Sequence, residues 1–123
     1  MTSHNSAYQG YIAAATKSAK DSEIEIILET TRRLRRANDT RNRDFPNFAA
    51  ALQDNRKLWT ILASDVASSG NGLPEDLRAR IFFLGEFTQA FTRRALQDTL
   101  SADPLIEINL AVLRGLSDKR NRS

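Results

Sequence analysis

The chain has no cysteine, only one histidine, and three prolines and five glycines among 123 residues. The absence of cysteine excludes disulfides, thiolate metal sites and a cysteine nucleophile, and it fits a reducing compartment. A metal or acid/base site needs several ligands, or a base with an orienting partner, and His4 stands alone near the N-terminus. We therefore expect no metal, no cofactor and no catalytic residue.

Long hydrophobic runs and enzyme motifs are also missing. No apolar run approaches the ~20 residues of a membrane span, and the N-terminus MTSHNSAYQG lacks the basic and apolar regions of a signal peptide. No G-x-G-x-x-G, P-loop, G-x-S-x-G or H-E-x-x-H sequence occurs. The net charge of +3 is too small to indicate nucleic-acid binding by itself. The expectation is a cytoplasmic protein that is not an enzyme.

The residues that are present predict helices. Hydrophobic residues make up 41% of the chain, without the sustained alternation of half-buried strands. We predict one all-α domain over residues 1–123, a compact bundle of about five helices with a long antiparallel central pair and no sheet. The expected helices span 6–18, 22–37, 45 to the SSGNGLP segment, 74–98 and 104–116, with flexible ends at 1–6 and 117–123.

Local signals place the helix ends. Ser22 and Glu25 have the S-x-x-E spacing of a capping box, which predicts a helix start. Asp44 can cap the helix that follows it. Gly70 and Gly72 can take the positive φ that a helix end and a tight reversal require. These signals predict a short link between two antiparallel helices at 68–74.

Apolar seams run along the predicted helices. The first helix has Tyr8, Tyr11, Ile12 and Ala15. The third has Phe45, Phe48, Leu52, Asn55, Trp59, Leu62 and Val66, at alternating steps of three and four. The fourth has Leu77, Ile81, Leu84, Thr88, Phe91 and Ala95.

Two asparagines lie inside apolar arcs, Asn55 on the third helix and Asn109 on the last. A buried amide costs stability unless it finds partners. We expect Asn55 to fix the pairing of its helix with a neighbour, near the final helix, with Trp59 as an anchor to the core. The alternative is that these amides hold a groove open for the backbone of a partner.

Some apolar side chains point away from every seam. Phe82 and Phe83 belong to a run of four apolar residues that cannot all face one core, since each helical residue turns by 100°. Ile26 likewise lies off the stripe of its helix. The candidate partner-binding residues are Ile26, Phe82, Phe83 and Phe87, and a groove bordered by the phenylalanines would hold a partner helix. Burial in the core or in a self-dimer is the alternative.

The strongest basic feature is the run RRLRRANDTRNR, which contains Arg32, Arg33, Arg35, Arg36, Arg41 and Arg43. Such a cluster can bind RNA phosphates, but no aromatic residue lies within it to stack on bases. A solvated helix face near a helix C-terminus is the simpler interpretation. Nucleic acid is therefore not the partner that we expect.

Three segments, AYQGY near the start, NRKLWTILASDVASSGNGLPEDLRARI at 55–81 and PLIEINLAVLRGL at 104–116, resemble the flagellar biosynthesis regulator FlaF family of alphaproteobacteria. The resemblance implies a cytoplasmic, chaperone-like adaptor that binds flagellin, supports its production or secretion, and works with the regulator FlbT. It implies no catalytic residue. The residues that match the family motifs are Asn55, Arg56, Leu58, Trp59, Leu62, Asp65, Ile106, Ile108 and Asn109.

Flagellin termini are amphipathic helical segments, and an open apolar helical surface can cover such a segment by helix-in-groove packing. We therefore expect a flagellin adaptor. An RNA-binding regulator of flagellin mRNA and a structural subunit that pairs with FlbT or with a second copy are the two rival hypotheses.

Overall fold

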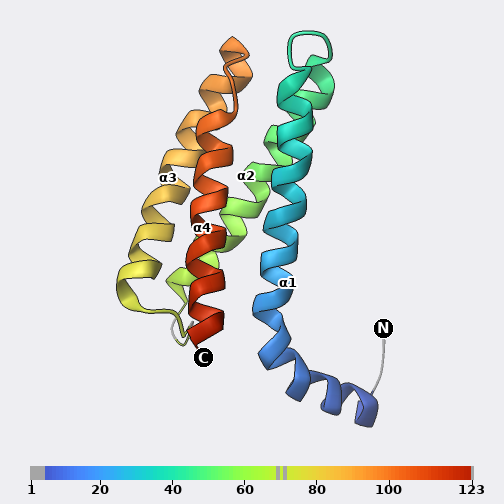
Figure 1. The fold of residues 1–123 in the computed structure, drawn as a ribbon, viewed down its shortest axis with the longest axis vertical. Helices are drawn as coiled ribbons and strands as arrows, with labels where there is room; N and C mark the ends of the chain where they lie inside the picture. Colours follow the sequence, from blue (N-terminus) through green and yellow to red (C-terminus); the bar gives the residue numbers. More distant parts are fainter. Residues whose placement is uncertain (1–4, 69, 71, 123) are drawn as a thin grey trace.

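A computed structural model describes residues 5–68, 70 and 72–122, with side chains for 22–68, 70 and 72–118. Four helices account for most of this part: α1 (Asn5–Asp39), α2 (Phe45–Ala67), α3 (Glu75–Asp98) and α4 (Asp103–Arg122). Figure 1 shows them running alternately up and down. The described residues contain no strand, so the all-α class is confirmed. The prediction of five helices was wrong by one.

The two helices expected at 6–18 and 22–37 are one continuous helix, α1. Residues 11–39 contain neither glycine nor proline, so nothing in that stretch breaks the helix. Ser22 and Glu25, expected as a capping box, lie inside α1 instead. The side chains of Tyr8, Tyr11, Ile12 and Ala15 precede the first side chain that the structure describes.

The other helix ends agree better with the sequence signals. The Asp44 side chain accepts a hydrogen bond from the backbone N–H of Asn47 at 3.3 Å and so caps α2. Gly70 and Gly72 have φ values of +82° and +91°, as the tight link between α2 and α3 requires. The last helix extends further than expected, through Arg122 rather than to Leu116.

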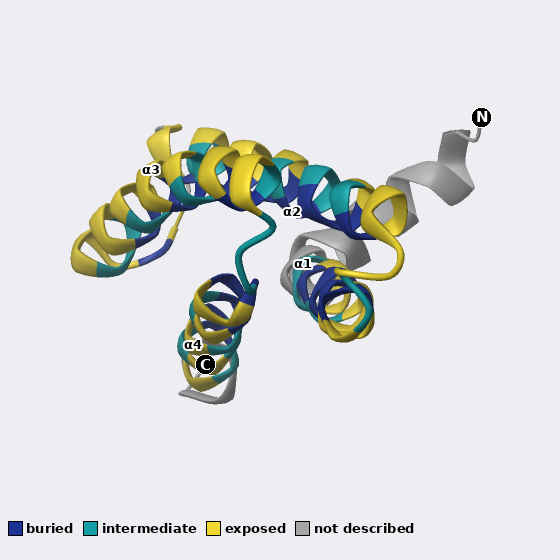
Figure 2. Ribbon diagram, turned by 90° about the horizontal axis from the view of Figure 1, so that it is seen from above, coloured by how far each residue is buried: buried dark blue, intermediate teal, exposed yellow. Residues whose placement is uncertain are grey.

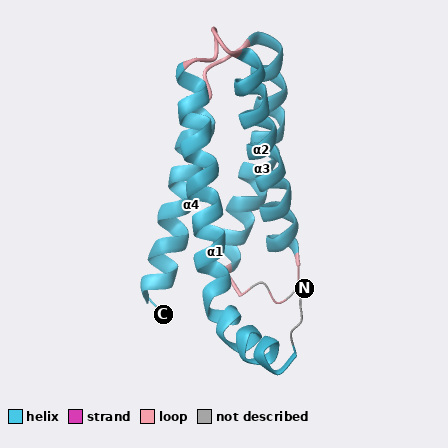
Figure 3. Ribbon diagram, turned by 90° about the vertical axis from the view of Figure 1, so that its right-hand side faces the viewer, coloured by secondary structure: helices cyan, strands magenta, loops and turns pink. Residues whose placement is uncertain are grey.

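The helices form a four-membered ring in which α1 contacts α2 and α4, and α3 packs mainly on α2 and much less on α4. Figure 3 shows α1 and α4 beside the α2–α3 pair, and Figure 2 shows the buried residues on the inward sides of the helices. The expected antiparallel pair is α2 and α3. Hydrogen bonds join this pair at mid-length, from Gln89 Nε2 to the Arg56 carbonyl (3.4 Å), and near the α2–α3 link, from Arg78 Nη1 to the Val66 carbonyl (3.5 Å).

The buried apolar residues form two clusters. One contains Ile27, Leu58, Trp59, Leu62, Val66, Leu73, Ile81, Val112 and Leu116. The other contains Leu34, Ala37, Phe48, Ala51, Leu52, Ala95, Ala102, Leu105 and Ile106. No helix in the described part has the long, weakly charged apolar stretch needed to cross a membrane.

Candidate functional site

A hydrogen-bonded group of buried polar side chains lies between the two apolar clusters. Asn109 on α4 accepts a hydrogen bond from Trp59 Nε1 at 2.8 Å through its Oδ1. Its Nδ2 donates to Asn55 Oδ1 at 2.8 Å and to Thr31 Oγ1 at 3.0 Å. Thr31 in turn donates to the Ile27 carbonyl at 2.6 Å. The expected link between Asn55 and the final helix is therefore present, and one amide joins α1, α2 and α4.

These four polar residues are almost completely buried: Asn55 and Asn109 have no exposed surface, and Trp59 and Thr31 have very little. A buried amide without partners is costly, so the bonds of Asn109 fix which helices meet at this level. The alternative of amides that line an open groove does not fit their burial. Asn55 and Trp59 are one turn apart on α2, and this spacing lets both of them bond to the amide of Asn109 on α4.

The remaining family-motif residues lie in or beside the same core. Leu58, Leu62 and Ile106 are buried, and Arg56, Asp65 and Ile108 are half-buried. The Arg56 carbonyl accepts hydrogen bonds from Thr60 and Gln89. The structure thus gives the matched motif residues internal positions rather than an exposed patch.

Helix α3 exposes three of its four phenylalanines. The residues that it buries are Ile81, Gly85, Thr88, Thr92 and Ala95, most of them small or polar. Phe83 is 71% exposed, and Phe82 and Phe87 are also exposed. Small residues let α3 approach α2 closely: a Cβ added at Gly85 would lie 3.4 Å from Ala63 Cβ. Helix α3 therefore buries threonines and presents an exposed aromatic surface, which is typical of a binding site for a partner.

The candidate partner-binding residues do not form one groove. Phe82 lies on the flank of α3 that faces α2, where it lines a surface pocket with Val66 and Ala67. Phe83 and Phe87 lie further around α3, and Phe87 stacks on Phe91 with ring centroids 5.9 Å apart. Ile26 is exposed on α1, beside Glu25, Glu29 and Arg33. Ile26 and Phe82 therefore belong to different surfaces from Phe83 and Phe87.

A small apolar pocket of about 80 Å³ lies between α3 and α4. Its lining residues are Leu77, Arg80, Ile81, Leu84, Ala111, Val112 and Gly115. Because Leu84 and Arg80 are one turn from Phe87 and Phe83, this pocket adjoins the aromatic side of α3. Its volume suits one side chain, since pockets for small molecules usually measure roughly 300–1,000 Å³.

Sequence reasoning missed two exposed apolar residues on α2. Ile61 is 66% exposed, and Phe45, expected on the seam, is 39% exposed. Ile61 lies between Trp59 and Leu62 in sequence but is not on their stripe, so the 100° step was the signal that could have found it. Phe45 is at the first turn of α2, where its ring lies beside that of Phe48, with centroids 6.3 Å apart.

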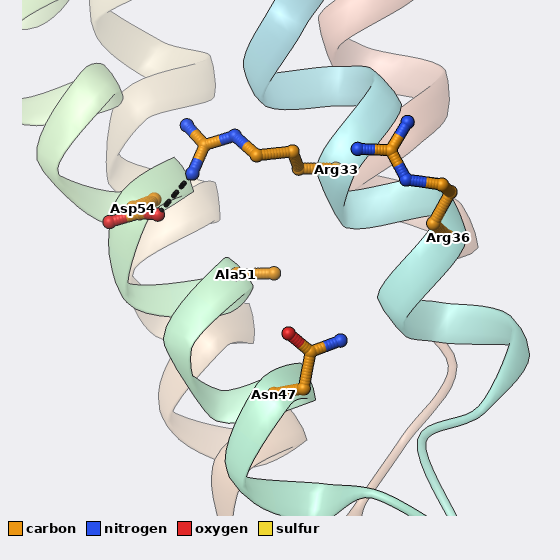
Figure 4. Close-up of a pocket in the computed structure, with 5 residues that line it drawn as sticks. All are labelled: Arg33, Arg36, Asn47, Ala51 and Asp54. Carbon is orange, nitrogen blue, oxygen red and sulfur yellow. Dashed lines mark hydrogen bonds and ion pairs between the residues drawn. The ribbon is translucent and has the colours of Figure 1, made fainter.

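The arginine cluster is partly engaged within the protein. Arg32 pairs with Glu29 at 3.1 Å, and Arg33 pairs with Asp54 of α2 at 2.6 Å. Figure 4 shows this second pair beside Arg36, in a pocket of about 170 Å³ between α1 and α2. Arg35, Arg36 and Arg43 have no ion pair within the described part.

Arg41 belongs to a hydrogen-bonded group at the end of the bundle where α1 ends and the α3–α4 link lies. It donates to the carbonyls of Asn38 and Thr99, at 3.0 Å and 3.3 Å. The Asn38 side chain accepts from the Ala102 N–H at 2.8 Å and donates to Asp103 at 3.2 Å. These bonds fasten the α3–α4 link to the end of α1, which leaves less of Arg41 for an outside phosphate.

The fold and these surfaces define a small all-α protein with a polar interior layer and an exposed aromatic helix. Among the side chains described, no group of His, Asp or Glu is placed to hold a metal ion. The sequence matches the family of the flagellar protein FlaF over residues 4–116, and the chain belongs to that family. Searches of curated proteins and of solved structures found no match.

Proposed function

We propose that this protein is a cytoplasmic, non-enzymatic adaptor that binds flagellin and regulates its synthesis and export during flagellum assembly, acting with FlbT. Its family places it in the flagellar system. The observation that carries the rest is the inverted face of α3, with Phe83 and Phe87 outside and Thr88 and Thr92 inside. An exposed apolar helix face beside an apolar pocket supports helix-in-groove binding, the mode that an amphipathic flagellin terminus would use.

Binding of the full chain to purified flagellin, measured by calorimetry, tests the proposal. We expect a complex at micromolar concentration. Phe83→Ser together with Phe87→Ser should weaken it by at least about tenfold, because buried aromatic side chains dominate such interfaces. Ile61→Ser is the control, since Ile61 is 66% exposed on another helix, against 71% for Phe83 and 43% for Phe87. No complex with folded wild-type protein would overturn the proposal.

A regulator that contacts flagellin mRNA through the arginine cluster is a weaker alternative. Arg32, Arg33 and Arg41 already have partners inside the protein, and this reduces the number of cations available for phosphates. Replacing Arg35, Arg36 and Arg43 by glutamine separates the two functions. Salt-sensitive RNA retention lost in that variant would favour RNA, because phosphate contacts weaken steeply with ionic strength.

Permanent occupation of the aromatic face by FlbT or by a second copy is the other alternative. Sedimentation of the chain alone and mixed with FlbT distinguishes them, with Phe83→Ser and Phe87→Ser introduced together in a parallel sample. A homodimer lost in that variant assigns the face to self-association, and a complex with FlbT lost in that variant assigns it to FlbT. A monomer that binds flagellin without FlbT supports the adaptor.

A further inference from the structure

Five residues form one stripe along α3, four of them exposed and Phe91 half-buried. They are Arg80, Phe83, Phe87, Phe91 and Arg94, and they advance by three, four, four and three positions. This spacing keeps all of them on one side of a helix. The stripe is about 21 Å long at 1.5 Å per residue, roughly four turns of a partner helix. An arginine therefore stands at each end of three phenylalanines.

Three side chains of the stripe, those of Phe87, Phe91 and Arg94, contact one another in sequence. Phe87 stacks on Phe91 at 5.9 Å, and the guanidinium of Arg94 lies 6.0 Å from the centre of the Phe91 ring. Arg80, at the other end, lines the apolar pocket between α3 and α4. The cations and the apolar surface are thus parts of one face, and a partner that covers the rings also meets the guanidinium groups.

The two arginines have no ion-pair partner in the described part of the chain. Asp76 and Asp98 lie one turn beyond them, at i−4 from Arg80 and i+4 from Arg94, but neither carboxylate comes within 4.0 Å of them. The Asp76 carboxylate instead accepts from the Leu77 N–H at 3.0 Å. Arg80 and Arg94 remain available to carboxylates of a partner, which guanidinium groups bind with two parallel hydrogen bonds.

We infer that the face formed by Arg80, Phe83, Phe87, Phe91 and Arg94 binds an amphipathic helix whose apolar side is bordered by Asp or Glu near both ends. The inference rests on the proposed function and specifies which kind of flagellin segment the protein selects. The apolar side of the partner covers the phenylalanines, and one aliphatic side chain enters the pocket between α3 and α4. The acidic residues pair with the arginines and fix the partner's register, since charge complementarity provides specificity.

Two synthetic peptides of about four turns, with identical apolar sides and either glutamate or lysine borders, test this with the full chain. We expect the glutamate peptide to bind at least about tenfold more tightly at low salt, with the difference shrinking as salt screens the pairs. Arg80→Glu with Arg94→Glu should reverse the preference. Arg35→Glu with Arg36→Glu is the control with the same charge change on α1, and it should keep the preference.

Equal affinity for both peptides, or an unchanged preference after the reversal at Arg80 and Arg94, would overturn the inference. Flagellin is titrated in parallel, so that the two failures can be told apart. Binding of the glutamate peptide without binding of flagellin removes the proposed function and leaves the charge rule. Binding of flagellin with no effect of the Arg80 and Arg94 reversal removes the charge rule alone. Self-association abolished by Phe83→Ser with Phe87→Ser would assign the face to a second copy and also overturn the inference.

Discussion

At the scale of single residues, Asn109 is a buried polar side chain that joins three helices. It makes three side-chain hydrogen bonds, to Trp59, Asn55 and Thr31, on two other helices, and it is completely buried. Asn55 keeps one unpaired donor, its Nδ2 group, and Thr88 and Thr92 on α3 also have hydroxyls without a partner in the described part. Some buried polar groups therefore lack a hydrogen-bond partner, while the Asn109 amide joins three helices. We expect the stability of the interior to depend on that amide.

Asn109→Ala should lower the free energy of unfolding by about 2–4 kcal/mol, because it leaves the indole N–H of Trp59 and the Oδ1 of Asn55 unpaired in the core. Urea unfolding followed by the fluorescence of Trp59, the only tryptophan, measures the change. Asn47→Ala, at an exposed amide on α2, is the control and should cost less than about 0.5 kcal/mol. Equal effects of the two substitutions would show that the network contributes nothing.

Thr99 is the one non-glycine residue with positive φ in the described part, at +52°, and it ends α3. Glycine takes this left-handed conformation without the steric penalty that a side chain incurs. Thr99→Gly should therefore raise the free energy of unfolding by about 0.5–1 kcal/mol. Thr99→Ala keeps the strain and serves as the comparison, so a gain in both variants would exclude the explanation.

At the scale of the helices, α3 shows where a stripe read from sequence departs from the packed face. The sequence stripe included Leu77, Leu84 and Phe91, which are half-buried. The fully buried positions include Gly85 and Thr92, which no hydrophobic pattern would select. Close packing on α2 determines which face of α3 is buried, because a helix with small residues on one side can approach its neighbour closely on that side.

Gly85 tests this close approach. Gly85→Ala should be neutral or stabilising by up to about 1 kcal/mol, since a Cβ would stand in ordinary contact with Ala63 and the helix would lose a glycine. Gly85→Leu should destabilise by about 1–3 kcal/mol, because a larger side chain must push α3 away from Trp59 and Ala63. Thermal unfolding of both variants gives the comparison, and a harmless leucine would contradict the packing described.

At the scale of the whole molecule, the sequence predicted the helical class, the antiparallel α2–α3 pair and the meeting of Asn55 with the last helix. It ended the last helix too early, at Leu116. It also placed a helix start at Ser22 that does not exist, because the capping signal at Ser22 and Glu25 fits a helix interior when no breaker separates the two segments. The sequence pattern grouped Phe82 with Phe83 and Phe87 because all three point away from the apolar seam of their helix. Which flank each occupies depends on where α2 and α4 lie against α3, and that information is tertiary.

The exposed aromatic face should be dispensable for folding. Phe83→Ala should change the free energy of unfolding by less than about 0.5 kcal/mol. Phe48→Ala, at a fully buried phenylalanine, should cost about 3–5 kcal/mol. Chemical denaturation of the two variants measures the contrast, and a large loss at Phe83 would place that ring in the core rather than at an interface.

The most direct test of the central claim, that the outward face of α3 binds flagellin, is site-specific photocrosslinking in the complex. A photoreactive residue replaces Phe83, Phe87 or, as a control of similar exposure on α2, Ile61. The account predicts covalent adducts with flagellin from positions 83 and 87 and none from position 61. Adducts from position 61, with none from 83 or 87 while the complex still forms, would contradict it.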